Sequence, residues 1–202
     1  MKYQDFYKTI KKPYFSRLDI AILGLKVFNY QISLWVKKGY IERIKRGLYV
    51  FSERKNEMSL EEMSFLIYEP SYISIEYALS HYGFIPEMVY SITAVTGKTT
   101  RTVGNKFGKF IYRSVKPSLF FGYKVIETKS GKYLLAEPEK ALLDYFYLNL
   151  KNINSKKDIE EARINCEMLK KTIDRKKLKF YLEKFDSKKM QKIIKIILNE
   201  IC

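Results

Sequence analysis

The stretch from Phe15 to Phe51 constrains the fold more than any other part of the chain, because glycines divide it into short segments of regular apolar spacing. Ser16 and Asp19 have the spacing of a capping box, which predicts that a helix begins there. Gly24 is expected to end this helix. The inner face of the helix is predicted to consist of Leu18, Ala21 and Ile22.

A second helix is predicted after a turn at residues 24–27, with Asn29 as its N-cap and Gly39 as the left-handed residue after its end. Two β-prone runs follow, residues 40–44 and 48–51, joined by the basic turn Lys45-Arg46-Gly47. The inward positions of the second helix, at i, i+3 and i+4, are predicted to be Ile32, Trp35 and Val36.

A further helix is predicted ahead of this stretch, and Pro13 is expected to follow its end. The apolar positions that define it recur at i, i+3, i+4 and i+7 and are Tyr3, Phe6, Tyr7 and Ile10. Three helices that lead into a hairpin with a basic turn are typical of a winged helix-turn-helix. We therefore predict this fold for residues 1–55.

A recognition helix places short polar side chains against base edges, and cations beside it contact the phosphates. We predict that DNA is contacted by Arg17, Asn29, Tyr30, Gln31, Ser33, Lys37, Lys38, Arg43, Lys45 and Arg46. Leu34 fits two assignments, the edge of the core or a contact to a thymine methyl group. The alternative for the lysines and arginines is an ordinary solvated face.

The positive charge is concentrated in the same part of the chain. The formal net charge of the 202-residue chain is +16 at pH 7, and residues 1–55 hold 13 Lys and Arg against 4 Asp and Glu. This distribution is expected when affinity for a nucleic acid comes largely from the release of phosphate counterions. A basic protein of the membrane surface would instead need a long amphipathic helix, whereas turns divide the N-terminal third of this chain.

Residues 56–202 are predicted to form a second, α+β domain, reached through a polar linker at residues 52–59. Short helices are expected after Ser59, which forms a capping box with Glu62, and at residues 75–82. A small, mainly antiparallel sheet is predicted from runs at 89–96, 109–115, 123–128 and 133–136. Pro138 then opens a helix, and C-terminal helices are predicted at 158–171, 174–184 and 187–201.

Residue patterns for catalysis are weak, so we expect neither enzymatic activity nor a cofactor or metal site. His81, the single histidine, lacks neighbours at ligand spacing and is interpreted as a helix-end or interface residue rather than a catalytic base. The sequence TGKTT at residues 96–100 lacks the first glycine of a phosphate-binding loop, because Ile92 stands there. Cys166 and Cys202 have no disulfide or metal-ligand spacing and are expected to be free thiols.

Glu139, Lys140 and Asp144 raise the hypothesis of a metal-dependent nuclease. A structural i, i+4 pair between Lys140 and Asp144 is the favoured interpretation, because one helix supplies all three side chains. No run of about 18 apolar residues predicts a membrane-spanning helix, and the first residues lack the apolar core of a secretory signal. We therefore expect a cytoplasmic protein.

Several short motifs in a fixed order give the chain a resemblance to the AbiEi family of antitoxins over roughly residues 5–150. They are KRGLYVF at residues 45–51, YISIEYALSHYGFI at 72–85, Thr100-Arg101, FIYRSV at 110–115 and AEPEKALLDYFYL at 136–148. R-G-x-Y and P-E-K-A-L-x-D are the strongest pieces. The family form often has Thr or Ser where Glu137 precedes the proline, and the C-terminal end matches none of these motifs.

The resemblance implies a transcriptional autorepressor that binds inverted repeats of double-stranded DNA in its own promoter. It places the DNA-binding face on the helix at residues 29–38 and on Lys45 and Arg46. It also implies that the second domain antagonises a nucleotidyltransferase-fold toxin of a type IV toxin-antitoxin system used in phage defence, with or without a stable complex between the two proteins. The alternatives are a stand-alone regulator with a sensing or dimerisation domain, and a nuclease.

Overall fold

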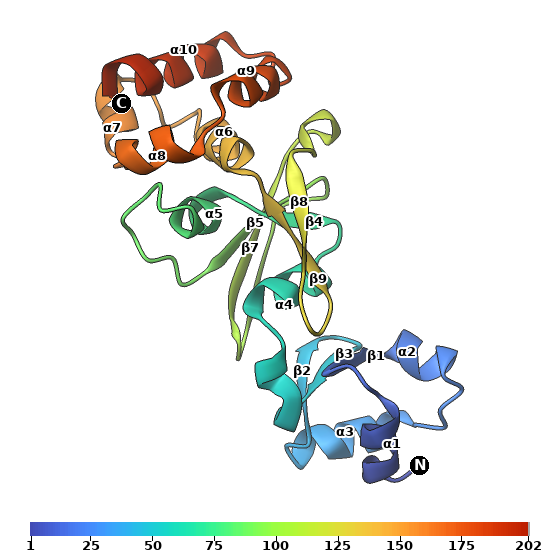
Figure 1. The fold of residues 1–202 in the computed structure, drawn as a ribbon. Helices are drawn as coiled ribbons and strands as arrows, with labels where there is room; N and C mark the ends of the chain where they lie inside the picture. Colours follow the sequence, from blue (N-terminus) through green and yellow to red (C-terminus); the bar gives the residue numbers. More distant parts are fainter. Residues whose placement is uncertain (202) are drawn as a thin grey trace. The chain divides into compact units, whose positions relative to one another are not determined.

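The computed structural model describes the backbone of residues 1–201 and the side chains of residues 1–199 (Figure 1). The chain has an α+β fold and divides into two compact units. The N-terminal unit comprises Met1–Met63 together with Glu127–Lys132, and the C-terminal unit comprises residues 64–126 and the chain from Tyr133 onward.

The N-terminal unit contains three short helices and a three-stranded antiparallel sheet with the strand order β1-β3-β2. In chain order its elements are α1 (Tyr3–Thr9), β1 (Tyr14–Ser16), α2 (Arg17–Ile22), α3 (Asn29–Lys37), β2 (Ile41–Lys45) and β3 (Leu48–Phe51). Aromatic side chains fill its core: the ring of Phe6 lies 4.8 Å from that of Phe15 and 5.1 Å from that of Trp35. The helices are therefore held by burial of large apolar surfaces rather than by their own length.

The predicted start of α2 is confirmed, but the predicted inner face is wrong. Ser16 and Asp19 form a capping box, and Gly24 has the left-handed φ of +61°. However, Leu18 and Ile22 are 67% and 71% exposed, and Ala21 is exposed as well. Ile20 is the buried residue of this helix. The prediction failed because nearly all positions from 18 to 23 are apolar, so their spacing does not indicate which face is buried.

In α3, Ile32 and Trp35 point into the core as predicted, whereas Val36 is 38% exposed. The segment predicted as a linker instead forms a 3₁₀ helix, η1 (Ser52–Glu57). Within it, Arg54 donates a hydrogen bond of 2.7 Å to the carbonyl of Ile10 and stacks 4.2 Å from the ring centroid of Tyr7. These contacts order η1 against α1 within the N-terminal unit.

A buried carboxylate lies at the start of α4 (Leu60–Ile67). Glu62 completes the predicted capping box with Ser59, because the Ser59 N–H donates to its carboxylate at 3.0 Å. The hydroxyls of Thr128 and Ser130 also donate to this carboxylate, at 2.5 and 2.7 Å. Glu62 is only 2% exposed, so these donors replace the water that its charge would otherwise bind.

The C-terminal unit contains a six-stranded sheet with the order β6-β7-β5-β4-β9-β8. Its strands are β4 (Ser71–Ile73), β5 (Ile92–Thr96), β6 (Arg101–Asn105), β7 (Gly108–Ser114), β8 (Tyr123–Glu127) and β9 (Lys132–Ala136), with the 3₁₀ helix η2 (Pro117–Leu119) before β8. The pairs β4–β5 and β6–β7 are antiparallel, while β4–β9 and β5–β7 are parallel. The sheet is therefore mixed.

Helices complete the C-terminal unit: α5 (Ile75–His81), α6 (Pro138–Leu148), α7 (Lys156–Glu160), α8 (Cys166–Thr172), α9 (Arg175–Glu183), α10 (Lys188–Ile196) and η3 (Ile197–Ile201). Figure 1 shows α6 to α10 gathered at one end of this unit. Pro138 occupies the first turn of α6, and Asp174 and Ser187 cap α9 and α10 as predicted.

Two predictions in this helical region are wrong. The single helix expected at residues 158–171 is split into α7 and α8, since Arg163 has a φ of +49° that a continuous helix excludes. Cys166 is not a free thiol, because it is disulfide-bonded. The prediction for Cys202 falls outside the described residues.

Candidate nucleic-acid interface

The outer face of α3 is a narrow stripe opposite the buried Ile32 and Trp35. With 3.6 residues per turn, positions i, i+3, i+4 and i+7 share this face. The stripe consists of Tyr30, Ser33, Leu34 and Lys37, all of which are exposed. The fold thus brings together Tyr30, Ser33 and Lys37, which were predicted to contact DNA. Of the two assignments of Leu34, the structure favours the exposed face.

The first turn of α3 differs from the prediction. Its N-cap is Phe28 rather than Asn29, and the Phe28 N–H donates to Oε1 of Gln31 at 3.0 Å. The amide nitrogen of Gln31 donates in turn to the carbonyl of Met1 at 2.8 Å. Gln31 therefore satisfies the helix terminus and ties it to the start of the chain. Asn29 is exposed beside this turn.

These contacts change the expected effect of substituting Gln31. Gln31→Ala removes two hydrogen bonds and is expected to lower the free energy of unfolding by about 1–2 kcal/mol. It is not expected to change the DNA sequence that the protein selects from a random library. Urea unfolding and library selection with the same variant test both statements. An altered selected site with unchanged stability would return Gln31 to the set of base-reading residues.

Arg17, Lys45 and Arg46 lie at the turn of the β2–β3 hairpin. Gly47 has a φ of +81°, which permits the tight turn after Arg46. The N–H of Arg17 donates to the carbonyl of Gly47 at 3.1 Å, which fixes the first residue of α2 beside the turn. All three cationic residues are exposed. Cationic residues from distant parts of the N-terminal unit's sequence therefore share one site.

The remaining predicted residues, Lys38 and Arg43, are also exposed. The Lys38 ammonium lies 5.9 Å from the ring centroid of Tyr40, and Arg43 lies on β2 opposite Tyr49. Nearby acids are used in local contacts: Asp19 accepts from Ser16 in the α2 cap. The potential of the N-terminal unit is positive because its lysines and arginines outnumber its acidic residues.

Sequence reasoning missed the apolar part of this surface. Phe28 is 59% exposed, and its ring stacks on that of Tyr30 with centroids 5.9 Å apart and an interplanar angle of 9°. Elsewhere in the N-terminal unit, Leu18 and Ile22 on α2 and Leu23 just after it are also more than half exposed. The sequence gives one sign of this exposure: the segment contains more apolar residues than one face of a helix can bury.

The predicted pair of Lys140 and Asp144 is confirmed and lies in the core of the C-terminal unit. The Lys140 ammonium donates to the Asp144 carboxylate and, at 2.8 Å, to the hydroxyl of Tyr72. Tyr72 and Ser74 each donate to the same carboxylate at 2.9 Å. The side chains of Lys140 and Asp144 are both 0% exposed.

This environment does not suit the nuclease hypothesis. Burial lowers the pKa of the Lys140 ammonium and raises the pKa of the Asp144 carboxyl, while the attraction between them opposes both shifts. Glu139 is also buried and accepts from the backbone N–H of Asp174 at 2.9 Å. Among the side chains of residues 1–199, no group of three or more His, Cys, Asp or Glu is arranged to hold a metal ion. Lys140 and Asp144 therefore form a buried structural pair, and Glu139 is bonded separately to the residue that caps α9.

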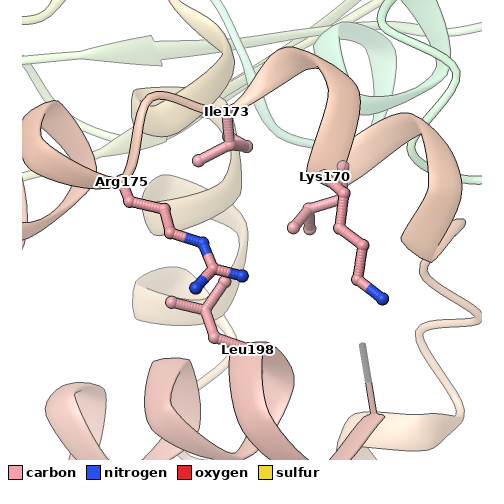
Figure 2. A pocket seen from close by; sticks show the side chains of 5 residues that line it. Lys170, Ile173, Arg175 and Leu198 are labelled. Carbon is pink, nitrogen blue, oxygen red and sulfur yellow. The ribbon is translucent and has the colours of Figure 1, made fainter.

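One cavity of the C-terminal unit is too small for an organic ligand. Figure 2 shows a cavity in the helical part of the C-terminal unit, lined by Leu169, Lys170, Ile173, Arg175 and Leu198. Its volume is about 10 Å³, which leaves room for about one water molecule. His81 is exposed at the last position of α5, as its sequence context predicted. None of the described helices combines the length and apolarity needed to cross a bilayer.

The comparison with known proteins places the recognisable segment in the N-terminal unit. No curated protein matches the chain. The segment that does match a family model begins just after α1 and runs through β1, α2, α3 and the β2–β3 hairpin. It thus includes every residue of the candidate interface. The match confirms the predicted resemblance over this segment: residues 10–52 match the family described as transcriptional regulator, AbiEi antitoxin.

Proposed function

We propose that this protein is a DNA-binding antitoxin and the transcriptional autorepressor of a type IV toxin-antitoxin operon. Its N-terminal unit reads inverted repeats in the promoter as a winged helix-turn-helix. Its C-terminal unit antagonises a nucleotidyltransferase-fold toxin. The match of residues 10–52 to the AbiEi family supports the regulatory role, and that same segment carries the exposed cationic residues.

The order of elements in the N-terminal unit supports a winged helix. Helix, strand, helix, helix and hairpin follow one another, and the sheet order β1-β3-β2 places the last strand between the other two. In such a domain the helix before the hairpin enters the major groove, and the hairpin turn lies along the backbone. Here α3 is that helix, and Arg46 and Gly47 form that turn.

The chemistry of the interface fits these roles. The stripe on α3 ends in Lys37, and the hairpin turn gathers Arg17, Lys45 and Arg46. Cations that neutralise phosphates release condensed counterions, so they supply affinity that does not depend on base sequence. Ser33 and the side chains around it then face the base edges. The exposed cationic interface within the matched segment is the single observation that carries the proposal.

Footprinting on the region upstream of its own gene tests the regulatory half of the proposal. We expect protection of two inverted half-sites and an affinity that falls steeply as salt rises. Absence of binding to duplex DNA at low salt would overturn it. Co-expression with a nucleotidyltransferase-fold toxin, sought in the reading frame next to the gene, tests the antitoxin half. DNA binding without relief of toxicity would indicate a stand-alone regulator.

A further inference from the structure

The outward-facing stripe of α3 carries large apolar side chains, whereas the outer face of a solvent-exposed helix is usually polar. Tyr30 is 68% exposed and Leu34 is 42% exposed, on adjacent turns of the same face. Phe28 extends this surface at the N-terminal end, where its ring stacks on Tyr30. Three large apolar side chains therefore remain in contact with solvent where the proposed function places the base pairs.

Polar base readers are few on the same face. Gln31, whose amide suits a bidentate contact to adenine, is held by the Phe28 N–H and the Met1 carbonyl. Ser33 lies between Tyr30 and Leu34 and offers a single hydroxyl. Lys37, one turn further along, carries a charge suited to phosphate or guanine. The exposed surface of the stripe is therefore mainly apolar.

The thymine C5-methyl is the apolar group that a major groove presents to a protein. We infer that α3 recognises A·T pairs through contacts of Tyr30, Leu34 and Phe28 with thymine methyl groups. This inference rests on the proposed DNA-binding function and names the bases that it reads. Affinity gained in this way comes from burial of apolar surface on both partners, and it adds to the salt-dependent affinity of the flanking cations.

A second copy of the chain is the other occupant to consider for this surface. In a symmetric dimer the same patch meets itself, so residues near the axis face their own copies. Pairing through α3 would place Lys37 and Lys38 of both copies at one interface, where an excess of like charge is unfavourable. A polyanion instead complements these lysines. The charge around the apolar stripe therefore favours DNA as the occupant.

Replacement of thymine by uracil tests the inference, because uracil pairs in the same way and lacks only the methyl group. The probe is a duplex selected by the protein from a randomised library, prepared with thymine or with deoxyuridine throughout. We expect roughly fourfold weaker binding for each methyl group contacted, and at least about tenfold for the fully substituted duplex. The slope of log K against log salt should stay unchanged, because the phosphate contacts are intact.

Variants assign the effect to the stripe. Leu34→Ala and Tyr30→Ala should bind the thymine duplex more weakly and lose part of the penalty for uracil. Phe180→Ala, which removes an exposed aromatic side chain from α9 in the C-terminal unit, serves as the control and should keep the full penalty. Circular dichroism melting establishes that each variant is folded. Because these side chains are exposed, their replacement should leave the melting temperature close to that of the wild type.

The possible outcomes separate this inference from the proposed function. Equal affinity of the wild type for the thymine and uracil duplexes would overturn methyl recognition and leave DNA binding intact. A uracil penalty that Leu34→Ala and Tyr30→Ala retain in full would also overturn it, because the methyl contacts would lie elsewhere. Failure to select any duplex from the library would overturn sequence-specific DNA binding itself. Thymine-rich sites with a penalty that the variants reduce would establish the inference.

Discussion

Lys140→Met is expected to lower the free energy of unfolding by about 3–5 kcal/mol, the cost typical of removing one partner from a buried ion pair. The Asp144 carboxylate would stay in a site that is 0% exposed and would keep only the hydroxyl donors of Tyr72 and Ser74. Rings of Phe121 and Phe185, with centroids 5.0 and 5.1 Å from the Lys140 ammonium, would offer that charge no compensation.

Urea unfolding followed by circular dichroism measures this loss. The double variant Lys140→Met/Asp144→Asn should be more stable than Lys140→Met alone, because the amide is neutral and its oxygen still accepts from both hydroxyls. Glu87→Gln is the exposed control: it weakens the surface pair with Arg163 and should change stability by no more than about 1 kcal/mol. A loss for Lys140→Met as small as that of the control would refute the structural role.

The double variant Lys45→Ala/Arg46→Ala is expected to reduce DNA affinity roughly thirtyfold at about 0.15 M salt if each residue neutralises one phosphate. The slope of log K against log salt should fall by about 1.8, since each lost contact releases one condensed counterion fewer. The reduction should be similar for specific and random duplexes, because phosphate contacts carry no sequence information. Fluorescence anisotropy across a salt titration gives affinity and slope together.

Lys8→Ala/Lys11→Ala is the matched control for this experiment. It removes the same charge from exposed positions on and after α1, away from the hairpin turn in the sequence. The affinity and the slope should change much less than in the hairpin variant. Equal losses in the two variants would mean that total charge, rather than the hairpin turn, determines binding. An unchanged slope in the hairpin variant would remove Lys45 and Arg46 from the interface.

Local signals in the sequence predicted helix ends well. Ser16, Ser59, Asp174 and Ser187 cap helices where expected, because a short polar side chain satisfies backbone N–H groups through contacts within a few residues. Gly39 has the predicted left-handed φ for the same local reason. Such features depend on neighbours in the sequence and not on tertiary packing. The domain boundary placed between residues 55 and 56 stays a prediction.

Features that depend on distant residues were not predictable. The strand β4, three residues long, lies in the middle of the six-stranded sheet, but its sequence has too few positions to define a period. Gln31 was predicted to read bases because residue spacing places it away from the buried positions of α3. Its hydrogen bond to the Met1 carbonyl exists only in the folded chain, so the sequence could not indicate it. The exposure of Leu18 and Ile22 likewise depends on which face of α2 the core covers.

The loop at residues 127–132 has a practical consequence for dissecting this protein. A gene fragment that ends after Met63 would encode the three helices and the hairpin but would lack the hydroxyls of Thr128 and Ser130. The Glu62 carboxylate of that fragment would lose two of the donors that hold it. Truncation is therefore a poor way to obtain the DNA-binding half in isolation. A fusion that reattaches the 127–132 loop through a short flexible connector is the better design.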